Sequence, residues 1–504
     1  MKTEKKKKSK ILSILGILMG CCLIYICLLC LFAAQWYVNT YGKTGFDSII
    51  FFLYAGVRGA ESGLISQFLL WAALPAFVTG SLLNCLLFLR PRKTFRFFPL
   101  RRVYAWLLGI AVCVGSLGYA MAITGAVDYT LSLNHPTTIF EDAYVSPENV
   151  EITFPENKRN LVVIYLESME TSFFSQTHGG AMEVELIPEL WQLANENVSF
   201  SHGQGPGGFR SVRGTTWTTG AMVGHLSGVP LKPSGTSGGY SQEGIFLPGL
   251  TTMTDILHEN GYYQELIVGS DATFGDRDAL YLHHGTDRVL DIYTAYEDGI
   301  VPQGYHVWWG MEDDKLFEYA KQELAALSAM DQPFALSMLT VDTHHIGGWV
   351  CESCPDRHPE QYSNVLSCSS AMVAEFVEWL RQQPYYDNTT IVIYGDHPTM
   401  DEVYIKHMVS DNYIRRGYNC IINSAVTPVS MENREFTTLD MFPTTLAAMG
   451  CTIPGDRLGL GTNLFSGRQT LAEELGFKEF DHLVSGRSDY YNNHFLQPDV
   501  AEEG

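Results

Sequence analysis

The segment NLVVIYLES at residues 160–168 decides the fold that we expect for this chain. Its first seven residues form an almost unbroken apolar run, which is typical of a strand buried on both faces of a parallel sheet. The run ends abruptly at Glu167. In an open α/β sheet, the residues that follow the carboxyl ends of the strands form the binding site. Glu167 is therefore a candidate functional residue, with ordinary helix capping as the alternative.

A second segment, IVIYGDH at residues 391–397, shows the same pattern and ends in Asp396 and His397. A carboxylate oxygen beside an imidazole nitrogen offers two ligand types that suit Mn²⁺ or Zn²⁺. The alternative is a turn aspartate followed by a structural histidine. Between the two segments lies RGTTWT at residues 213–218, a hydroxyl cluster that offers either a nucleophile or helix-capping groups.

Two more apolar runs end in residues that suit phosphate chemistry. LTVDTHH at residues 339–345 brings His344, and DATFGDRD at residues 271–278 brings Arg277. A guanidinium matches the oxygens of a phosphate, although Arg277 could equally pair with a neighbouring aspartate on the surface.

Strand and helix patterns alternate after residue 159, which predicts an α/β domain with a mostly parallel central sheet covered by helices on both faces. The expected strands are 160–167, 263–270, 333–342 and 389–395, and the expected helices are 188–197, 251–260, 313–327, 369–383 and 437–449.

Three stretches, at about 11–38, 65–89 and 103–124, are apolar and long enough to be transmembrane helices. The first is too long for the apolar core of a signal peptide, so we expect a retained anchor. Six lysines precede it, and six basic residues lie between residues 90 and 102. The positive-inside rule places both groups in the cytoplasm. It follows that the chain is a multi-pass protein of the cell membrane whose domain after residue 125 is extracytoplasmic.

Net charge argues against one class of partner. Residues 103–504 carry 19 basic and 52 acidic side chains. A domain this acidic would be repelled by the phosphate backbone, so we expect no nucleic-acid binding.

The cysteines fit the same location. Five of the 11 cysteines lie outside the membrane stretches, at positions 351, 354, 368, 420 and 451. Cys351 and Cys354 have the spacing of a redox or zinc motif, but no second pair completes a zinc site. A structural disulfide between Cys354 and Cys368 is the favoured reading, and an extracytoplasmic compartment permits it.

The expected organisation has four parts. Residues 1–124 are a membrane anchor, residues 125–158 a linker, residues 159–475 an extracytoplasmic catalytic domain of the sulfatase type, and residues 476–504 a loosely packed tail.

Together these motifs resemble the lipoteichoic acid synthase / phosphoglycerol transferase family, within the alkaline phosphatase–sulfatase superfamily. The resemblance covers the anchor and residues 158–467. The residues that carry it are YLES at 165–168, GTTWT at 214–218 with GVPL at 228–231, TVDTH at 340–344, YGDH at 394–397, and DMFPT at 440–444 with LGLGTNL at 458–464. The GTTWT form is closest to the phosphoglycerol transferases that modify osmoregulated glucans.

This resemblance implies one divalent ion, Mn²⁺ with Zn²⁺ or Mg²⁺ as alternatives, held by Glu167, Thr215, Asp396 and His397. It implies that Thr215 is the nucleophile, with Thr216 as the alternative register, and that His344 and Arg277 bind the transferred group. The cysteine or serine motif of the sulfatases is absent. The polymer synthases have a tryptophan where this chain has Gly275.

The implied reaction moves glycerol phosphate from phosphatidylglycerol to an envelope glycan, glycolipid or teichoic-acid-type acceptor through a covalent threonine intermediate. Two alternatives are a phosphoethanolamine transferase of the same superfamily and a non-catalytic sensor that binds envelope polymers.

Overall fold

The computed structural model describes residues 2–42, 45–56, 58–59, 63–88, 101–232, 240–242, 245–410 and 412–497. They form two compact units. One contains residues 1–43 and 61–128, and the other contains residues 44–60 and 129–504. Most of the basic connection at 90–102, on which the expected topology depends, lies outside the described residues.

The first unit is helical. Three of its helices are long and apolar enough to cross a membrane, at Ile14–Tyr41, Leu64–Phe88 and Val103–Ile123, and they coincide with the three stretches expected from the sequence. The first lies within α1 (Lys2–Tyr41), the second comprises α3 (Leu64–Phe68), a π-helical turn (Leu69–Ala73) and α4 (Leu74–Phe88), and the third lies within α5 (Arg101–Ile123). Small side chains let these helices approach closely: Cys27, Ala76 and Cys113 form their buried contact with Ile24 and Leu28.

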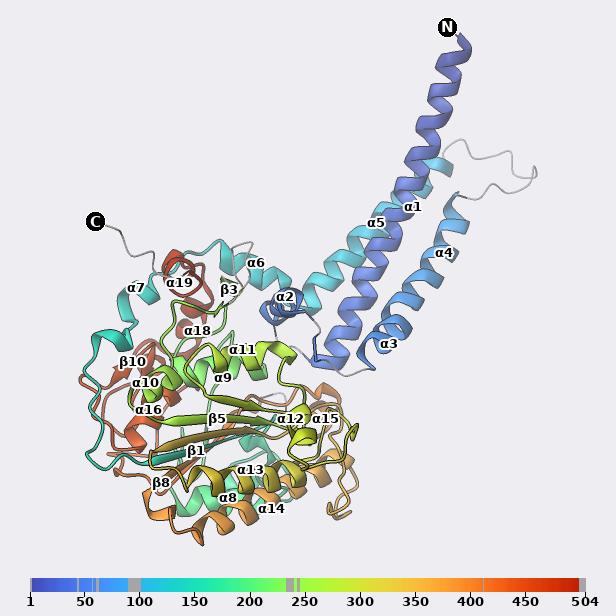
Figure 1. The fold of residues 1–504 in the computed structure, drawn as a ribbon. Coiled ribbons are helices and arrows are strands. Elements are labelled where there is room, and N and C mark those ends of the chain that lie inside the picture. Colours follow the sequence, from blue (N-terminus) through green and yellow to red (C-terminus); the bar gives the residue numbers. More distant parts are fainter. Residues whose placement is uncertain are drawn as a thin grey trace. The chain divides into compact units, whose positions relative to one another are not determined.

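The second unit is built on a seven-stranded sheet with the order β2-β9-β8-β1-β7-β5-β6 (Figure 1). Strands β8, β1, β7, β5 and β6 are parallel to one another. Strand β9 is antiparallel to β8, and β2 at the edge is antiparallel to β9. The predicted fold class is therefore confirmed. The strands are β1 (Asn160–Leu166), β2 (Gly208–Phe209), β5 (Tyr263–Val268), β6 (Arg288–Leu290), β7 (Phe334–Leu339), β8 (Thr389–Gly395) and β9 (Gly417–Ile422).

The continuous apolar run of β1 serves two cores. Leu161, Val163 and Tyr165 face one core, and Val162, Ile164 and Leu166 face the other. Because successive side chains of a strand point to opposite faces, a strand covered on both sides must be apolar at every position. The helices covering the first face are α9 (Thr218–Ser227), α10 (Met253–Glu259) and α16 (Met441–Ala448), and those covering the second are α8 (Pro188–Glu196), α13 (Asp313–Leu327) and α14 (Gln361–Arg381).

Segments outside the predicted core also take part in this unit. Residues 125–158 contain α6 (Ala126–Leu133) and α7 (Ile139–Ala143). The short helix α2 (Phe46–Ala55), which lies between the first two candidate spans in the sequence, belongs to the second unit. The expectation of a loosely packed C-terminal tail is wrong for the described part, because Phe480, Tyr491 and Phe495 are buried in the larger core.

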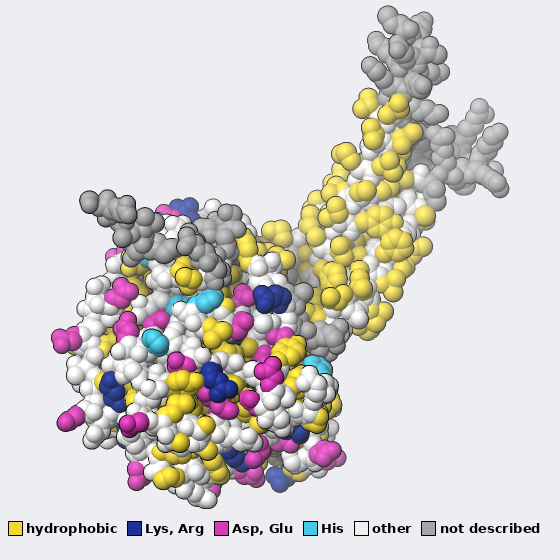
Figure 2. Space-filling model, viewed as in Figure 1, with side chains coloured by type: hydrophobic (Ala, Val, Ile, Leu, Met, Phe, Trp, Pro, Cys, Tyr) yellow, Lys and Arg dark blue, Asp and Glu magenta, His cyan; other side chains and the backbone are white. Residues whose placement is uncertain are grey.

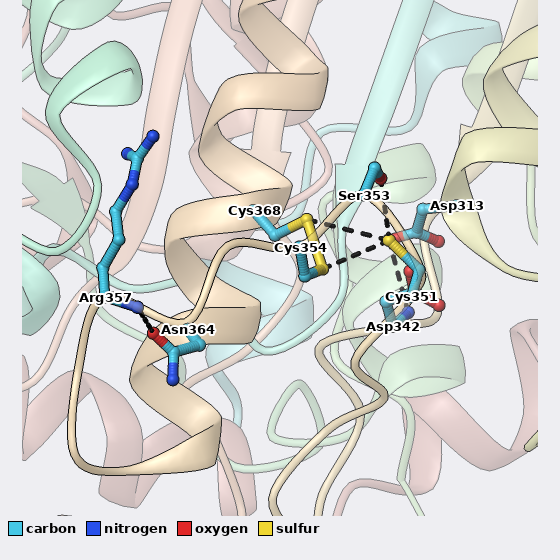
Figure 3. The surroundings of a disulfide bond; sticks show 8 residues. All are labelled: Asp313, Asp342, Cys351, Ser353, Cys354, Arg357, Asn364 and Cys368. Atoms are coloured by element: carbon cyan, nitrogen blue, oxygen red, sulfur yellow. Dashed lines mark hydrogen bonds between the residues drawn. A yellow bond between two sulfur atoms is a disulfide. The ribbon is translucent and has the colours of Figure 1, made fainter.

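The disulfide between Cys354 and Cys368 is present and confirms the favoured pairing (Figure 3). It ties the loop after β7 to helix α14. The third sulfur of the cluster, Cys351 Sγ, lies 3.2 Å from Cys354 Sγ and beside the buried Asp313 and Asp342.

One glycine fixes the end of β8. A Cβ at Gly395 would lie 1.7 Å from the carbonyl oxygen of Met169. We therefore expect Gly395→Ala to lower the free energy of unfolding by about 3 kcal/mol, at the upper end of the usual cost of overpacking. Gly203→Ala is the matched control, since a Cβ there meets nothing within 4 Å. Chemical denaturation followed by circular dichroism compares the two, and equal stability would show that the β1–β8 junction is loose.

Candidate active site

The site lies where β1 and β8 end side by side. The two strands are paired in parallel from Asn160↔Thr389 to Leu166↔Gly395. Glu167 and Asp396 are the next residues, so the register alone makes them neighbours. Both carboxylates are buried, with Glu167 3% and Asp396 0% exposed. The sequence prediction that these residues converge is realised in the structure.

Backbone hydrogen bonds hold this junction. Asp396 Oδ1 accepts the N–H groups of Ser168 and His397, both at 2.7 Å. Glu167 donates its N–H to Thr340 Oγ1 at 3.0 Å, and its carbonyl accepts the hydroxyl of Thr343 at 2.6 Å. The β7 loop therefore fixes Glu167 from the other side.

The candidate ligand atoms lie close to one another. Glu167, Asp396 and His397 each offer a ligand atom, and these atoms lie within 4.8 Å of one another. His397 Nδ1 donates to the carbonyl of Pro398 at 3.0 Å, which leaves Nε2 for a ligand. Nε2 lies 3.3 Å from Asp396 Oδ2 and 3.7 Å from Glu167 Oε1. Asp396 Oδ2 is buried and has no hydrogen-bond partner among the described residues.

These features meet the requirements of a divalent cation. Two buried carboxylates and a neutral imidazole form a mixed oxygen and nitrogen set suited to Mn²⁺ or Zn²⁺. A buried carboxylate oxygen without a partner is costly unless a cation or proton neutralises it. The residues therefore fit a metal site.

The structure does not place Thr215, the predicted nucleophile, at the cluster of Glu167, Asp396 and His397. Thr215 Oγ1 is fully buried and donates to the carbonyl of Val212 at 2.8 Å, and it lies 3.2 Å from Thr438 Oγ1. Thr218 instead reaches the cluster, with Oγ1 3.2 Å from Glu167 Oε2 and 3.4 Å from His397 Nε2.

The physical reason is the start of helix α9. Residues 212–215 form a turn, in which the N–H of Thr215 bonds to the carbonyl of Val212, and the helix begins only at Thr218. Thr218 is the first helical residue and is half-buried. A helix start directly after Trp217 is the feature that separates Thr218 from Thr215, and the RGTTWT motif alone does not fix where the helix begins.

Arg277 interacts electrostatically with Glu167. Its Nη2 donates to Ser270 Oγ at 3.0 Å and to the carbonyl of Asp271 at 2.7 Å, and its Nε donates to the carbonyl of Phe274 at 2.9 Å. Burial lowers the pKa of Arg277 to about 10, against the opposing charge of Glu167, so the side chain stays cationic at neutral pH.

His344 faces the cluster from the β7 loop. Its Nδ1 donates to the carbonyl of His345 at 2.8 Å, so Nε2 can act as an acceptor. Burial lowers the pKa of His344 in spite of the nearby Glu167 charge. The ring of Trp309 packs 4.4 Å from it, and 5.1 Å from Phe274. Trp309, from another loop, thus packs against both His344 and the residue before Gly275.

The pKa values of the three candidate ligands depend on one another. Burial raises the pKa of Asp396 to about 7, and the charge of Glu167 adds to the rise. Burial also opposes the charged form of Glu167, but His344 and His397 outweigh it and lower the pKa of that carboxyl. Burial likewise opposes the charged form of His397, and the two carboxylates outweigh it and raise its pKa.

Comparison with known proteins agrees with this geometry. Residues 159–451, more than half of the chain, match the family described as Sulfatase. The chain belongs to this family. It is 30% identical to phosphoglycerol transferase I of Xanthomonas campestris pv. campestris (strain B100) over 319 residues, and 32% identical to that of Xanthomonas euvesicatoria pv. vesicatoria over 337 residues. These matches confirm the resemblance to the phosphoglycerol transferases.

The matches are partial. They cover 62% and 64% of this chain and only 43% and 45% of the two relatives, so the chain spans less than half the length of the curated relatives it matches. Among solved structures, the integral membrane phosphoethanolamine transferase A from Neisseria meningitidis is similar in fold, with a TM-score of 0.50 at 13% identity, over 93% of this chain and 87% of the other. The lipoteichoic acid synthase LtaP from Listeria monocytogenes gives a TM-score of 0.49 at 18% identity, over 65% and 80%.

The proton arrangement predicts a pH dependence for metal binding. A bound cation requires Asp396 without its proton and His397 neutral, and both pKa values are raised in the protein alone. Because Asp396 must lose its proton, the affinity for Mn²⁺ should fall by about tenfold for each pH unit below pH 7. Above pH 7 the ionisation of Asp396 should no longer change this affinity. Isothermal titration calorimetry of the full chain in detergent at several pH values measures this.

Two asparagine variants control the experiment. Asp396→Asn removes a ligand and should abolish Mn²⁺ binding. Asp342→Asn alters another buried carboxyl, whose pKa burial raises to about 10 so that it is already uncharged, and should leave binding unchanged. Affinity that does not change between pH 5 and 8 would contradict the assignment of Asp396.

Proposed function

We propose that this chain is a membrane-bound phosphotransferase that moves glycerol phosphate from phosphatidylglycerol to a hydroxyl group of an envelope glycan, glycolipid or teichoic-acid-type polymer. One observation carries the proposal: Thr218 is only partly buried and lies at the start of a helix, with its hydroxyl oxygen 3.2 Å from Glu167 Oε2 and 3.4 Å from His397 Nε2. We assign Thr218, in place of Thr215, as the nucleophile.

The proposed cofactor is one Mn²⁺ ion held by Glu167, Asp396, His397 and the oxygen of Thr218. When bound, such an ion lowers the pKa of the hydroxyl and offsets the charge of the phosphate. Zn²⁺ and Mg²⁺ remain alternatives.

In the first half-reaction, Thr218 Oγ forms a bond to the phosphorus of phosphatidylglycerol, and the bond from phosphorus to the diacylglycerol oxygen breaks. The hydroxyl proton leaves Thr218, and the diacylglycerol oxygen takes up a proton. In the second half-reaction, an acceptor hydroxyl displaces Thr218 from phosphorus and restores its proton. The sum moves glycerol phosphate and leaves the protein unchanged.

The surrounding groups support these steps. No side chain caps the first turn of α9, so its N–H groups are available to a phosphate oxygen. Arg277, cationic at neutral pH, offsets the charge of the same group. We assign His344 Nε2 as the proton carrier at the leaving or attacking oxygen, because its Nδ1 is already engaged and its lowered pKa keeps the ring neutral.

The N-terminal apolar helices suggest where the catalytic unit works. We propose that the catalytic unit is extracytoplasmic and that the membrane helices keep it near its lipid donor, which raises the local concentration of that donor. The disulfide accords with this compartment. The excess of acidic side chains, visible as scattered Asp and Glu in Figure 2, argues against nucleic acid as a partner.

Paired valine variants test the nucleophile. Full-length protein in vesicles of phosphatidylglycerol, with Mn²⁺ and no acceptor, should acquire the mass of one glycerophosphate group. Thr218→Val should acquire none, because it lacks the attacking oxygen. Thr215→Val should still be modified and lose about 1 kcal/mol of stability, since only buried hydrogen bonds are lost. Mass spectrometry of the intact protein and of its peptides measures both.

Vesicles of phosphatidylethanolamine complete the design. An adduct of ethanolamine phosphate in place of glycerol phosphate would assign the other transferase activity. An adduct that persists in Thr218→Val and disappears in Thr215→Val would overturn our nucleophile assignment. The absence of any adduct from both lipids, in protein that binds Mn²⁺, would favour the non-catalytic polymer sensor.

A further inference from the structure

We infer that helix α2 is an interfacial helix, whose outer side lies in the surface of the phospholipid bilayer while its inner side forms part of the wall of the active site. The inference concerns where this segment lies, and it does not require the proposed reaction.

The inner side of α2 is packed against the catalytic unit. Its buried residues are Asp47, Ser48 and Phe51, which share one side of the helix. The ring of Phe51 lies 5.8 Å from Trp217, the residue before Thr218, and 5.0 Å from Tyr240. Phe52 stacks on Phe274 at 5.6 Å.

Asp47, in the first turn of α2, holds the turn at residues 212–215, which comes shortly before Thr218. The buried carboxyl of Asp47 accepts the backbone N–H of Gly214 and lies in the field of Arg213. Phe274, on which Phe52 stacks, supplies the carbonyl that Arg277 binds. Thus α2 contacts both loops that present site residues.

The outer side of α2 is apolar where a soluble protein would place charge. Residues 46, 49, 50 and 53 are Phe, Ile, Ile and Leu, and this spacing puts them together on the side opposite Asp47 and Phe51. Leu53 is 74% exposed and Tyr54 is 49% exposed. Asp47 is the only charged residue of the helix, and it faces inward. A helix that is apolar all round is normally covered on all sides.

The sequence position of α2 identifies what covers its outer side. Four residues separate the end of α1 at Tyr41 from Phe46, and eight separate Ala55 from Leu64. Candidate membrane spans therefore flank α2 on both sides, at Ile14–Tyr41 and Leu64–Phe88. With ten residues α2 is too short to cross a bilayer itself, which leaves the interface as the environment that suits its composition.

A second segment next to a span has the same character. Helix α6 follows the span Val103–Ile123 within three residues, and it exposes Leu131 at 54% and Leu133 at 41%. Tyr129 of α6 packs its ring 5.4 Å from that of Phe46. Two separate stretches of chain, each leading directly out of a span, thus bring exposed apolar side chains to one region of the catalytic unit.

This placement of α2 would bring the bilayer surface close to the active site. A bilayer surface in contact with the outer side of α2 would lie one helix thickness from the wall that Phe51 and Phe52 form beside Thr218 and Arg277. A phospholipid headgroup could then reach the nucleophile while its acyl chains stay in the membrane.

Fluorescence quenching of the full chain in vesicles tests this placement. A bimane label is attached to Leu53→Cys, or to Tyr54→Cys as a second position, after Cys22, Cys30 and Cys85, the exposed thiols of the described chain, are replaced by Ala. Val429→Cys is the matched control. It is also 74% exposed, and it follows β9, which runs antiparallel to β8 and so leads to the opposite end of the sheet.

We expect the labels at 53 and 54 to be quenched by lipids that carry a nitroxide near the headgroup, and to be at least about threefold less accessible to aqueous iodide than the label at 429. Equal access of iodide to 53 and 429 would overturn the inference. Protection of 53 from both quenchers would also overturn it, because protein would then cover the helix. Unchanged thermal unfolding of each variant confirms that the label leaves the fold intact.

Discussion

The parallel pairing of β1 with β8 is the constraint on which the site depends. It ends both strands at the same level, so that Glu167 and Asp396 leave the sheet as neighbours, and His397 follows at once. Two buried carboxylates this close repel each other, and Asp396 relieves the repulsion through its raised pKa when no ion is present. A divalent cation would stabilise the charged forms of both. The fold thus creates a place whose electrostatics suit a divalent cation.

The remaining site residues are positioned by separate elements around that junction. Helix α9 presents Thr218 at its first turn, the β7 loop presents His344, and the turn before residue 277 presents Arg277 with its Nη2 held by Ser270 and Asp271. The contacts that hold His344 and Arg277 are local in the sequence, whereas those of Thr218 with Glu167 and His397 join distant segments. The helix α2 packs against residues of two of these elements, Trp217 and Phe274, and it lies in the sequence between two candidate membrane spans.

The elements with a strong local pattern could be predicted from the sequence, and those set by tertiary contacts could not. The apolar runs of β1, β5, β7 and β8 and their terminal polar residues identified the sheet, Glu167, Asp396 and His397. Strand β9 was missed because its centre carries Asn419, whose amide bonds only to the distant Phe200 and Gly207. Thr215 was preferred to Thr218 because the sequence does not fix where helix α9 begins. In the structure Thr215 lies in a buried turn against Thr438, and Thr218 begins the helix beside Glu167.

The most direct test of the central claim is anomalous diffraction at the manganese absorption edge, from crystals of the full chain grown with Mn²⁺. We expect one strong peak among Glu167, Asp396, His397 and Thr218, within about 2.4 Å of a ligand atom of each. A manganese peak elsewhere in the catalytic unit, or no peak in a crystal whose protein is fully folded and soaked at neutral pH, would contradict the account.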